Sequence, residues 1–350
     1  MEPQSEYATA ADGVRIATLA YGDESGWPLL IAATPPWSHV QLEYRIPPVR
    51  AWSDGMGEMA RVVRYDCRGT GLSDRDPLDF SMEAQVRDVE AVADHYQMPS
   101  FVLWGSIGGS PASIVYAARH PERVSHLLLW AGYARGALLV RRPEANALGE
   151  LLRENWEMYT DTYAQAAFGW PASDTGAQYA ALTRAGITQE GMVAFVRTMA
   201  GVDVTAEARR VQSPTLVMTR RGSKFSGVDD ARELASLIPQ ARLLVLEGSA
   251  AAPFLGDTAA VFAAVNEFIA MNATPRRPKR AAVPLTEREM QVLRLLANGQ
   301  TGKEIASELG ISVSTAQRHI ANIYAKIGAR GRVDAAAYAF EQGIVRAQQP

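Results

Sequence analysis

The chain has 350 residues, of which 47% are hydrophobic and 21% are charged, a composition typical of folded globular proteins. No apolar run is long enough to span a membrane, the first residues lack the basic and apolar regions of a signal peptide, and the single cysteine, Cys67, cannot form an internal disulfide. These features exclude membrane-spanning and disulfide-stabilised classes, and we expect a cytoplasmic location without a membrane partner.

Charge is distributed unevenly along the chain. Residues 276–350 contain 12 basic and 6 acidic residues, whereas the rest of the chain contains 23 basic and 32 acidic residues. A basic part attached to an acidic body favours a polyanion as the partner of that part. Segment 271–284 has three prolines and four basic residues, which is linker composition. We therefore expect a large domain over residues 1–270 and a small one over residues 285–350.

The large domain alternates short β-rich runs with helical stretches. Six apolar runs are typical of buried strands in a mostly parallel sheet: PLLIAA, RVVRYD, FVLWG, HLLLWAG, TLVMTR and RLLVLEG. The helical segments between these runs predict an α/β fold. Residues 136–204 interrupt the alternation, and we expect them to form an inserted helical cap.

A strand, a glycine-rich turn and a helix follow one another in FVLWGSIGGSPASIVYAARHPERV. This is the layout that presents the nucleophile of an α/β-hydrolase. On this segment, and on ADGVRIA, YDCRGTGLSDR and PTLVM, the large domain resembles the α/β-hydrolase superfamily. In the usual Gly-x-Ser-x-Gly motif of that family, Ser106 and Gly108 are present, while Trp104 replaces the first glycine.

The resemblance implies a catalytic triad in the chain order serine, acid, histidine. Aligning VLEGSAAAPFLGD with the loop that carries the histidine places Ala251 at that position, and Ser223, or Gly222, falls where the acid would follow TLVM. A serine without its base and acid is a poor nucleophile. We therefore predict a non-enzyme with no catalytic residues, no metal and no cofactor.

Without the catalytic groups, we expect the active-site cavity of the hydrolase fold to serve as a binding site for a small molecule. Ser106 and the amide of Ile107 would lie at a helix N-terminus, which suits a carbonyl, carboxylate or hydroxyl group of a small, mostly apolar ligand. The other residues expected to contact it are Trp37, Ser38, His39, Trp104, Tyr133, Trp156, Tyr159, Trp170 and Ala251.

Two alternatives remain open at this stage. His39, in the loop PPWSHVQ, could serve as a non-standard base for Ser106, which would make the chain an esterase fused to a second domain. Alternatively, the large domain only dimerises, and its cavity is filled by Trp37, Trp104 and Tyr133.

The residues after the linker predict four helices. Thr286 and Glu289 form a capping box at the first, Gly310 suits the left-handed position that ends the second, and Ser312 or Ser314 caps the third. The apolar positions of the third helix fall on one stripe: Ala316, Ile320, Ile323 and Ile327.

This small domain resembles the LuxR-type helix-turn-helix family through LTERE, LANG, KEIA, LGIS, STAQRHI and IYAKIG. The resemblance implies binding of double-stranded DNA as a homodimer that pairs through the fourth helix, about Val333 to Gln342. The third helix would enter the major groove and present Gln317, Arg318 and Ala321 to base edges, with glutamine suited to adenine. The other expected DNA-binding residues are Thr301, Lys303, Ser312, Ser314, Thr315, Asn322 and Lys326.

The two domains together predict a one-component transcription regulator. Its degenerate hydrolase chamber would sense a small molecule, and its helix-turn-helix domain would read an operator.

Overall fold

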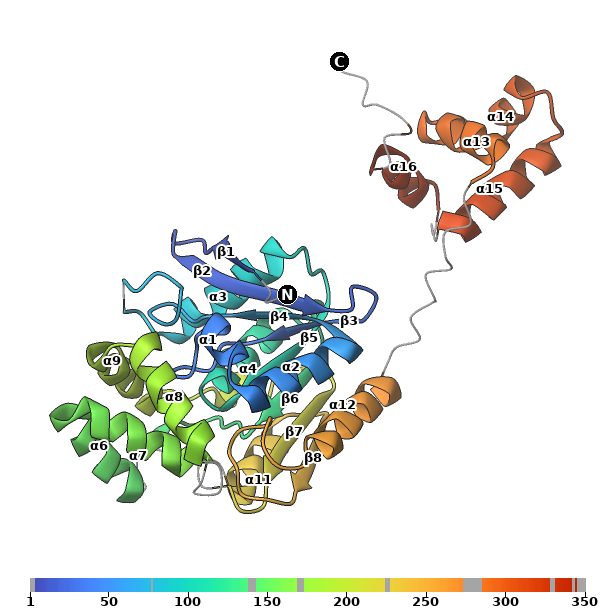
Figure 1. Ribbon diagram of the computed structural model, residues 1–350. Coiled ribbons are helices and arrows are strands. Elements are labelled where there is room, and N and C mark those ends of the chain that lie inside the picture. Colours follow the sequence, from blue (N-terminus) through green and yellow to red (C-terminus); the bar gives the residue numbers. More distant parts are fainter. Residues whose placement is uncertain are drawn as a thin grey trace. The chain divides into compact units, whose positions relative to one another are not determined.

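The computed structural model describes residues 4–76, 78–137, 143–168, 173–223, 227–272, 285–327, 331–341 and 344. Contacts divide the chain into two compact units, Met1–Asn272 and Ala273–Pro350 (Figure 1). Of the expected linker, Met271 and Asn272 complete the last helix of the first unit. Residues 273–284 lie outside the described residues.

An eight-stranded sheet forms the centre of the first unit, in the order β1-β2-β4-β3-β5-β6-β7-β8. The strands are β1 (Ser5–Thr9), β2 (Arg15–Gly22), β3 (Trp27–Ile31), β4 (Ala60–Tyr65), β5 (Phe101–Ser106), β6 (Val124–Trp130), β7 (Thr215–Arg220) and β8 (Ala241–Leu246). β1 and β2 pair antiparallel, and strands β3 to β8 are all parallel. The six apolar runs are therefore strands, and the expected α/β architecture is confirmed.

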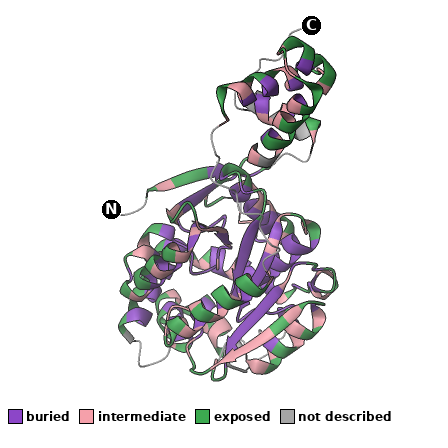
Figure 2. Cartoon of the chain, turned by 90° about the vertical axis from the view of Figure 1, so that its right-hand side faces the viewer, coloured by how far each residue is buried: buried purple, intermediate pink, exposed green. Residues whose placement is uncertain are grey.

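Helices cover both faces of this sheet, because the central strands are apolar on both sides. Trp52 and Phe268 belong to the cluster on one face, and Val89, Ile114 and Leu234 belong to the cluster on the other. Figure 2 shows the resulting buried sheet between partly exposed helices. These helices are α1 (Val40–Tyr44), α2 (Pro47–Met59), α3 (Met82–His95), α4 (Ser110–Arg119), α11 (Val228–Leu237) and α12 (Thr258–Asn272).

A helical insertion separates β6 from β7, at the place where the cap is expected. It contains α6 (Pro143–Glu154), α7 (Trp156–Phe168), α8 (Ser173–Gly186), α9 (Gln189–Ala200) and α10 (Thr205–Ala208). Trp156, Tyr159 and Tyr163 lie on one face of α7 and stack at centroid distances of 5.7 and 5.5 Å. Tyr163 in turn stacks on Trp37 of the core at 5.1 Å, which ties the cap to the sheet.

The second unit contains α13 (Glu287–Ala297), α14 (Gly302–Glu308), α15 (Val313–Ile327) and α16 (Arg332–Glu341). The Thr286–Glu289 capping box is confirmed, and Thr301 and Glu304 form another at α14. Gly310 adopts φ +63° at the end of α14. Of the two candidate caps of α15, Ser312 is the one that precedes the helix, and its hydroxyl accepts from the amide of Thr315.

The core of the second unit matches the expected apolar stripe in part. Ala316 and Ile323 are buried against Val292, Leu293 and Ile305, and Ile320 is partly buried beside them. The side chain of Ile327 lies outside the described residues. Within the described ranges, no helix combines the length and the apolar character needed to cross a membrane.

Candidate functional site

The sharp turn between β5 and α4 has Ile107 at its tip. Ile107 has φ +42°, whereas Ser106 is the last residue of β5 and keeps an extended φ of −116°. A positive φ at a β-branched residue is a genuine conformational outlier. The strained position of this strand-to-helix turn, which carries the nucleophile in hydrolases, is therefore occupied by isoleucine.

Two glycines, one on either side of Ile107, show which residue stands at the centre of the Gly-x-Ser-x-Gly type of motif. A Cβ atom at Gly105 would lie 2.5 Å from Ser113 Oγ, and one at Gly109 would lie 2.4 Å from Ala33 O. Small residues two positions before and after the tip are what the close-packed turn requires, so the motif runs from Gly105 to Gly109 with Ile107 at its centre. The expectation that Ser106 occupies the nucleophile position, with Trp104 replacing a glycine, is wrong by one residue.

Ser106 is instead a strand residue on the same face of β5 as Trp104, because strand side chains alternate. The indole Nε1–H of Trp104 donates to Ser106 Oγ at 2.7 Å. This bond occupies a lone pair of the hydroxyl oxygen and leaves its own hydrogen to donate elsewhere. The arrangement suits a hydrogen-bond donor better than a nucleophile.

His39 does not act on Ser106 in this structure. It caps α1, and its Nδ1 accepts from the amide of Leu42 at 3.3 Å. Burial lowers the pKa of His39 below its ordinary value. In the part of the chain that the structure describes, no hydrogen bond joins His39 to Ser106.

The carboxyl end of β7 carries a buried arginine near the place where a hydrolase has its acid. Arg220 is 2% exposed and follows five apolar or hydroxyl residues of β7. Its guanidinium donates to backbone carbonyls of the loop after β8, namely those of Ala250, Ala252, Pro253 and Leu255. Gly222 and Ser223, the expected acid positions, follow Arg220, and the Gly222 amide donates to Gly248 O.

Trp130 holds the same loop from β6. Its indole Nε1–H donates to the carbonyl of Ala251 at 2.6 Å, and the guanidinium of Arg220 lies over its ring at 5.0 Å. Arg220 and Trp130 thus bind the loop through its backbone. Ala251 itself is buried.

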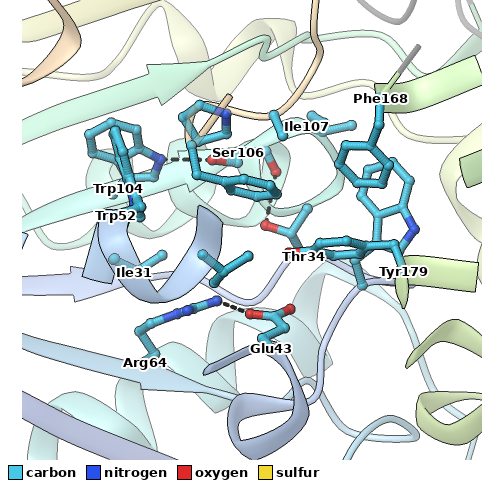
Figure 3. Close-up of a pocket in the computed structure, with 15 residues that line it drawn as sticks. Ile31, Thr34, Glu43, Trp52, Arg64, Trp104, Ser106, Ile107, Phe168 and Tyr179 are labelled. Carbon is cyan, nitrogen blue, oxygen red and sulfur yellow. Dashed lines mark hydrogen bonds and ion pairs between the residues drawn. The ribbon is translucent and has the colours of Figure 1, made fainter. Parts of the chain in front are cut away.

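A cavity of about 80 Å³ opens beside this turn, at the carboxyl ends of β3, β4 and β5 (Figure 3). Its walls are mostly apolar, with several aromatic side chains, and α7 and α8 of the cap contribute Phe168 and Tyr179. The lining residues are Ile31, Thr34, Trp37, Glu43, Val49, Trp52, Arg64, Trp104, Ser106, Ile107, Phe168, Tyr179, Ala252, Pro253 and Phe254. This position, outside the carboxyl ends of parallel strands, is where ligands bind in α/β sheets.

Four of the expected ligand-binding residues line this cavity: Trp37, Trp104, Ser106 and Ile107. Ser38 lines a neighbouring space of about 20 Å³ and donates to Asp66. The residues that line neither space are His39, Tyr133, Trp156, Tyr159 and Ala251. Tyr133 packs under the cap with its hydroxyl on Met199 Sδ, and Trp156 and Tyr159 belong to the stack on α7. Trp170 lies outside the described residues.

Glu43 and Arg64 form a largely buried ion pair on the cavity wall that the sequence did not reveal. The side chain of Glu43 is 4% exposed and that of Arg64 is 19% exposed, and Arg64 Nη2 donates to Glu43 Oε2. Burial raises the pKa of Glu43, and Arg64 opposes this rise. Residues 43 and 64 are distant in sequence, and no local pattern connects them.

The second unit exposes a polar face on α15. Gln317, Arg318, Ala321 and Asn322 are exposed on the side opposite the buried Ala316 and Ile323. Ser312, at the start of this helix, forms hydroxyl contacts of 2.9 Å with Ser314 and 2.8 Å with Thr315. Thr301 caps α14, and Lys303 is exposed in the first turn of that helix. The expected base-reading residues therefore share one accessible surface.

Two family models match separate parts of the chain, one in each unit. A family described as "Bacterial regulatory proteins, luxR family" matches residues 283–339, and "alpha/beta hydrolase fold" matches residues 56–193. Response regulator protein VraR of Staphylococcus epidermidis is 24% identical over 186 residues, which is 45% of this chain and 89% of that protein. Its namesake from Staphylococcus aureus is 40% identical over 73 residues, covering 20% of this chain and 35% of its own length.

The chain carries a LuxR-type helix-turn-helix domain after an α/β-hydrolase fold. Solved structures agree on the fold of the first unit. A hydrolase from Pseudomonas aeruginosa PA01 has a TM-score of 0.65 at 20% identity and covers 76% of this chain and 98% of its own. The enol-lactonase from Burkholderia xenovorans LB400 has a TM-score of 0.63 at 21% identity, covering 76% and 100%.

Within the LuxR-type domain, one residue expected to contact DNA has a partner inside the domain. Lys326 Nζ donates to Glu289 Oε2 at 2.6 Å, and Glu289 is almost fully buried beneath it. The bond with Lys326 is the main reason why the pKa of Glu289 falls to about 2. Lys326 therefore ties α15 to α13 through this ion pair, and its contact with DNA stays a prediction.

Proposed function

We propose that this protein is a one-component transcription regulator whose hydrolase-fold unit binds a small molecule without cleaving it. The observation that carries the proposal is Ile107 at the strained tip of the β5–α4 turn, since isoleucine has no atom that can attack a carbonyl. The LuxR-type domain supplies the DNA-binding function.

The surroundings of the turn support the absence of catalysis. Ser106 accepts a hydrogen bond from Trp104 and has no histidine partner among the described residues. Arg220 and Trp130 hold the loop after β8 through its carbonyls, at the place where a triad would need a carboxylate and an imidazole. An assay with p-nitrophenyl butyrate tests this directly. We expect equal background rates for the wild type and Ser106→Ala, whereas turnover that depends on Ser106 would make the protein an esterase.

The ligand-binding part of the proposal rests on the cavity. Apolar walls with a few converging polar groups are typical of small-molecule sites. The Ser106 hydroxyl has a hydrogen left to donate, so a carbonyl, carboxylate or hydroxyl oxygen of the ligand would face it. Ser106→Ala should weaken ligand binding by about 1 kcal/mol, the usual net contribution of one hydrogen bond. The volume of about 80 Å³ favours a compact ligand.

DNA recognition is proposed for the exposed face of α15. Gln317 and Arg318 would contact base edges in the major groove, with Ala321 and Asn322 beside them. Phosphates would be bound from the start of α15 and from α14 by Thr301, Lys303, Ser312, Ser314 and Thr315. Pairing of two copies through α16 stays a prediction. Such a dimer would place its two recognition helices, α15 of each copy, on successive half-sites of the operator.

A regulator must couple its two sites, and a ligand can do so only by binding two states with different affinity. We expect the affinity for the operator to change when the cavity is filled. The test is operator binding with and without saturating ligand, using full-length protein. Equal affinities would remove the sensing function and leave a DNA-binding protein with a structural body.

A further inference from the structure

The cavity wall is mostly apolar and, besides the Thr34 hydroxyl, which donates to the Ser106 carbonyl, it carries polar groups at two places. At one place is the Ser106 hydroxyl, and at the other is the ion pair of Glu43 and Arg64 (Figure 3). Trp52 and Trp104 supply apolar surface beside them. A ligand that fills this space therefore meets a hydrogen-bond donor at Ser106 and a fixed positive–negative pair at Arg64 and Glu43.

The ion pair has capacity beyond its own bond. A guanidinium has five N–H donors and a carboxylate has about four acceptor sites, and a single hydrogen bond joins Arg64 to Glu43 among the described residues. Tyr21 and Tyr179 also lie close to this guanidinium, and the five N–H donors still outnumber these three neighbours. A buried pair of this kind gives little net stability, because removing both charges from water costs about as much as their attraction returns. Binding of a ligand would explain why the Glu43–Arg64 ion pair lies on a cavity wall.

The charge balance of the wall restricts what that ligand can be. Glu43 and Arg64 are the charged residues in the lining, and together they are neutral. An anionic group placed against Arg64 would also meet the carboxylate of Glu43, and a cationic group would meet Arg64. A neutral group with a hydrogen to give and a lone pair to receive satisfies both partners at once.

We propose that the cavity selects neutral cyclic molecules that present a carbonyl oxygen to Ser106 and a hydroxyl group to Glu43 and Arg64. This inference rests on the proposed ligand-binding function and narrows it to one class. The hydroxyl group donates to Glu43 and accepts from Arg64, the ring lies among the tryptophans, and the carbonyl accepts from Ser106. Charged analogues of the same shape bind less well.

Three probes test this selection by calorimetry on the full-length protein at pH 7: 4-hydroxycyclohexanone, cyclohexanone and 4-oxocyclohexanecarboxylate. The wild type should bind the hydroxyl probe about tenfold or more tighter than cyclohexanone, because a hydrogen bond to a charged group is at stake. The carboxylate probe should bind more weakly than the hydroxyl probe. Equal affinities for the first two, or the tightest binding by the carboxylate, would overturn the inference.

Two variants locate the selectivity in the ion pair. Glu43→Leu/Arg64→Met replaces both charges by apolar groups, which commonly leaves stability unchanged, and it should bind the first two probes equally. Glu43→Gln, which keeps a hydrogen-bonding partner for Arg64, should bind the carboxylate probe about tenfold better than the wild type does. The ion pair does not determine selectivity if the double variant still binds the hydroxyl probe more tightly than cyclohexanone. The same conclusion follows if Glu43→Gln binds the carboxylate probe no more tightly than the wild type does.

The outcomes also separate this inference from the function beneath it. Ser106→Ala should weaken all three ketones by a similar factor, since all three carry the same carbonyl. The three ketones could bind with equal affinity that falls in Ser106→Ala but is unchanged in the Glu43 variants. That result would support the proposed ligand-binding function and contradict selection by the ion pair. Binding by none of the three ketones would count against both.

Discussion

Two buried arginines at the carboxyl ends of the sheet have opposite surroundings. Arg220, at the end of β7, donates to four backbone carbonyls and lies over Trp130, and no carboxylate bonds it within the described ranges. Arg64, near the end of β4, makes one hydrogen bond to Glu43 and faces a cavity. A guanidinium whose donors are used by the backbone holds a structure together, whereas one with donors to spare can bind a ligand.

The same distinction applies to two lysines of the LuxR-type domain. Lys326 is bonded to the buried Glu289, whereas Lys303 is exposed and forms no ion pair among the residues described. We therefore expect Arg220 and Lys326 to act on stability, and Arg64 and Lys303 to act on binding. Four substitutions test this division.

The largest effect should follow Arg220→Ala. This change leaves the carbonyls of the loop after β8 without their donors, and hydrogen bonds to charged groups contribute more than neutral ones. We expect a loss of about 4 kcal/mol in the free energy of unfolding, measured by urea denaturation. The matched control is Arg221→Ala, since Arg221 is the next residue, is exposed and pairs only with the exposed Glu247 among the described ion pairs. A small effect at Arg220 would show that the loop is held by other contacts.

The next effect should follow Arg64→Met, which leaves the Glu43 carboxylate buried and unpaired. Removing one partner of a buried pair costs about 3 kcal/mol at pH 7. Burial then raises the pKa of Glu43 further, so the carboxyl takes up a proton and the loss shrinks as the pH falls from 7 toward the ordinary glutamate pKa. Denaturation at pH 7 and pH 5 checks the sign.

The control for that experiment is the double variant Glu43→Leu/Arg64→Met, which should stay within about 1 kcal/mol of the wild type. If the double variant is as unstable as Arg64→Met, the pair is a structural element like Arg220, and the contrast between the two arginines fails.

Local signals make much of the fold predictable from the sequence. The capping box of Thr286 and Glu289, the left-handed Gly310 and the apolar strand runs each depend on neighbours in the chain, and the structure confirms them. The sequence also predicts the strand-to-helix turn, but a frame centred on Ser106 is displaced by one residue. The spacing of Gly105 and Gly109 around Ile107 is the signal that identifies the correct frame.

The cavity is harder to predict because its polar groups come from distant segments. Glu43 lies on α1 and Arg64 on β4, and only the folded sheet brings them together. Arg220 likewise meets a loop further along the chain, with a separation of 32 residues from Ala252. The family motif alone assigns Lys326 to DNA, whereas its partner Glu289 is 37 residues away and is found only in the fold.

Lys326→Met should destabilise the LuxR-type domain by roughly 1 to 2 kcal/mol at pH 7, since the ion pair is partly buried. The pKa of Glu289 is depressed to about 2, so its stabilising effect is complete above the ordinary glutamate pKa and is lost as the pH falls from there through the depressed value. The variant should therefore show a flatter decline of stability over this acid range. A steeper salt dependence of DNA binding in the wild type than in the variant would instead support a phosphate contact.

Lys303→Ala should leave the unfolding free energy unchanged and act on DNA alone. A lysine that neutralises one phosphate contributes about 0.9 to the slope of log affinity against log salt concentration, so the slope should become shallower by about that amount. The loss should be similar for specific and unrelated DNA, because a phosphate contact carries no sequence information. Arg294→Ala is the control, since Arg294 is an exposed basic residue of α13 that is not among the residues expected to contact DNA. An unchanged slope for Lys303→Ala would mean that an exposed lysine near the polar face of α15 need not contact DNA. The distinction between a lysine that acts on binding and one that acts on stability would then depend on Lys326 alone.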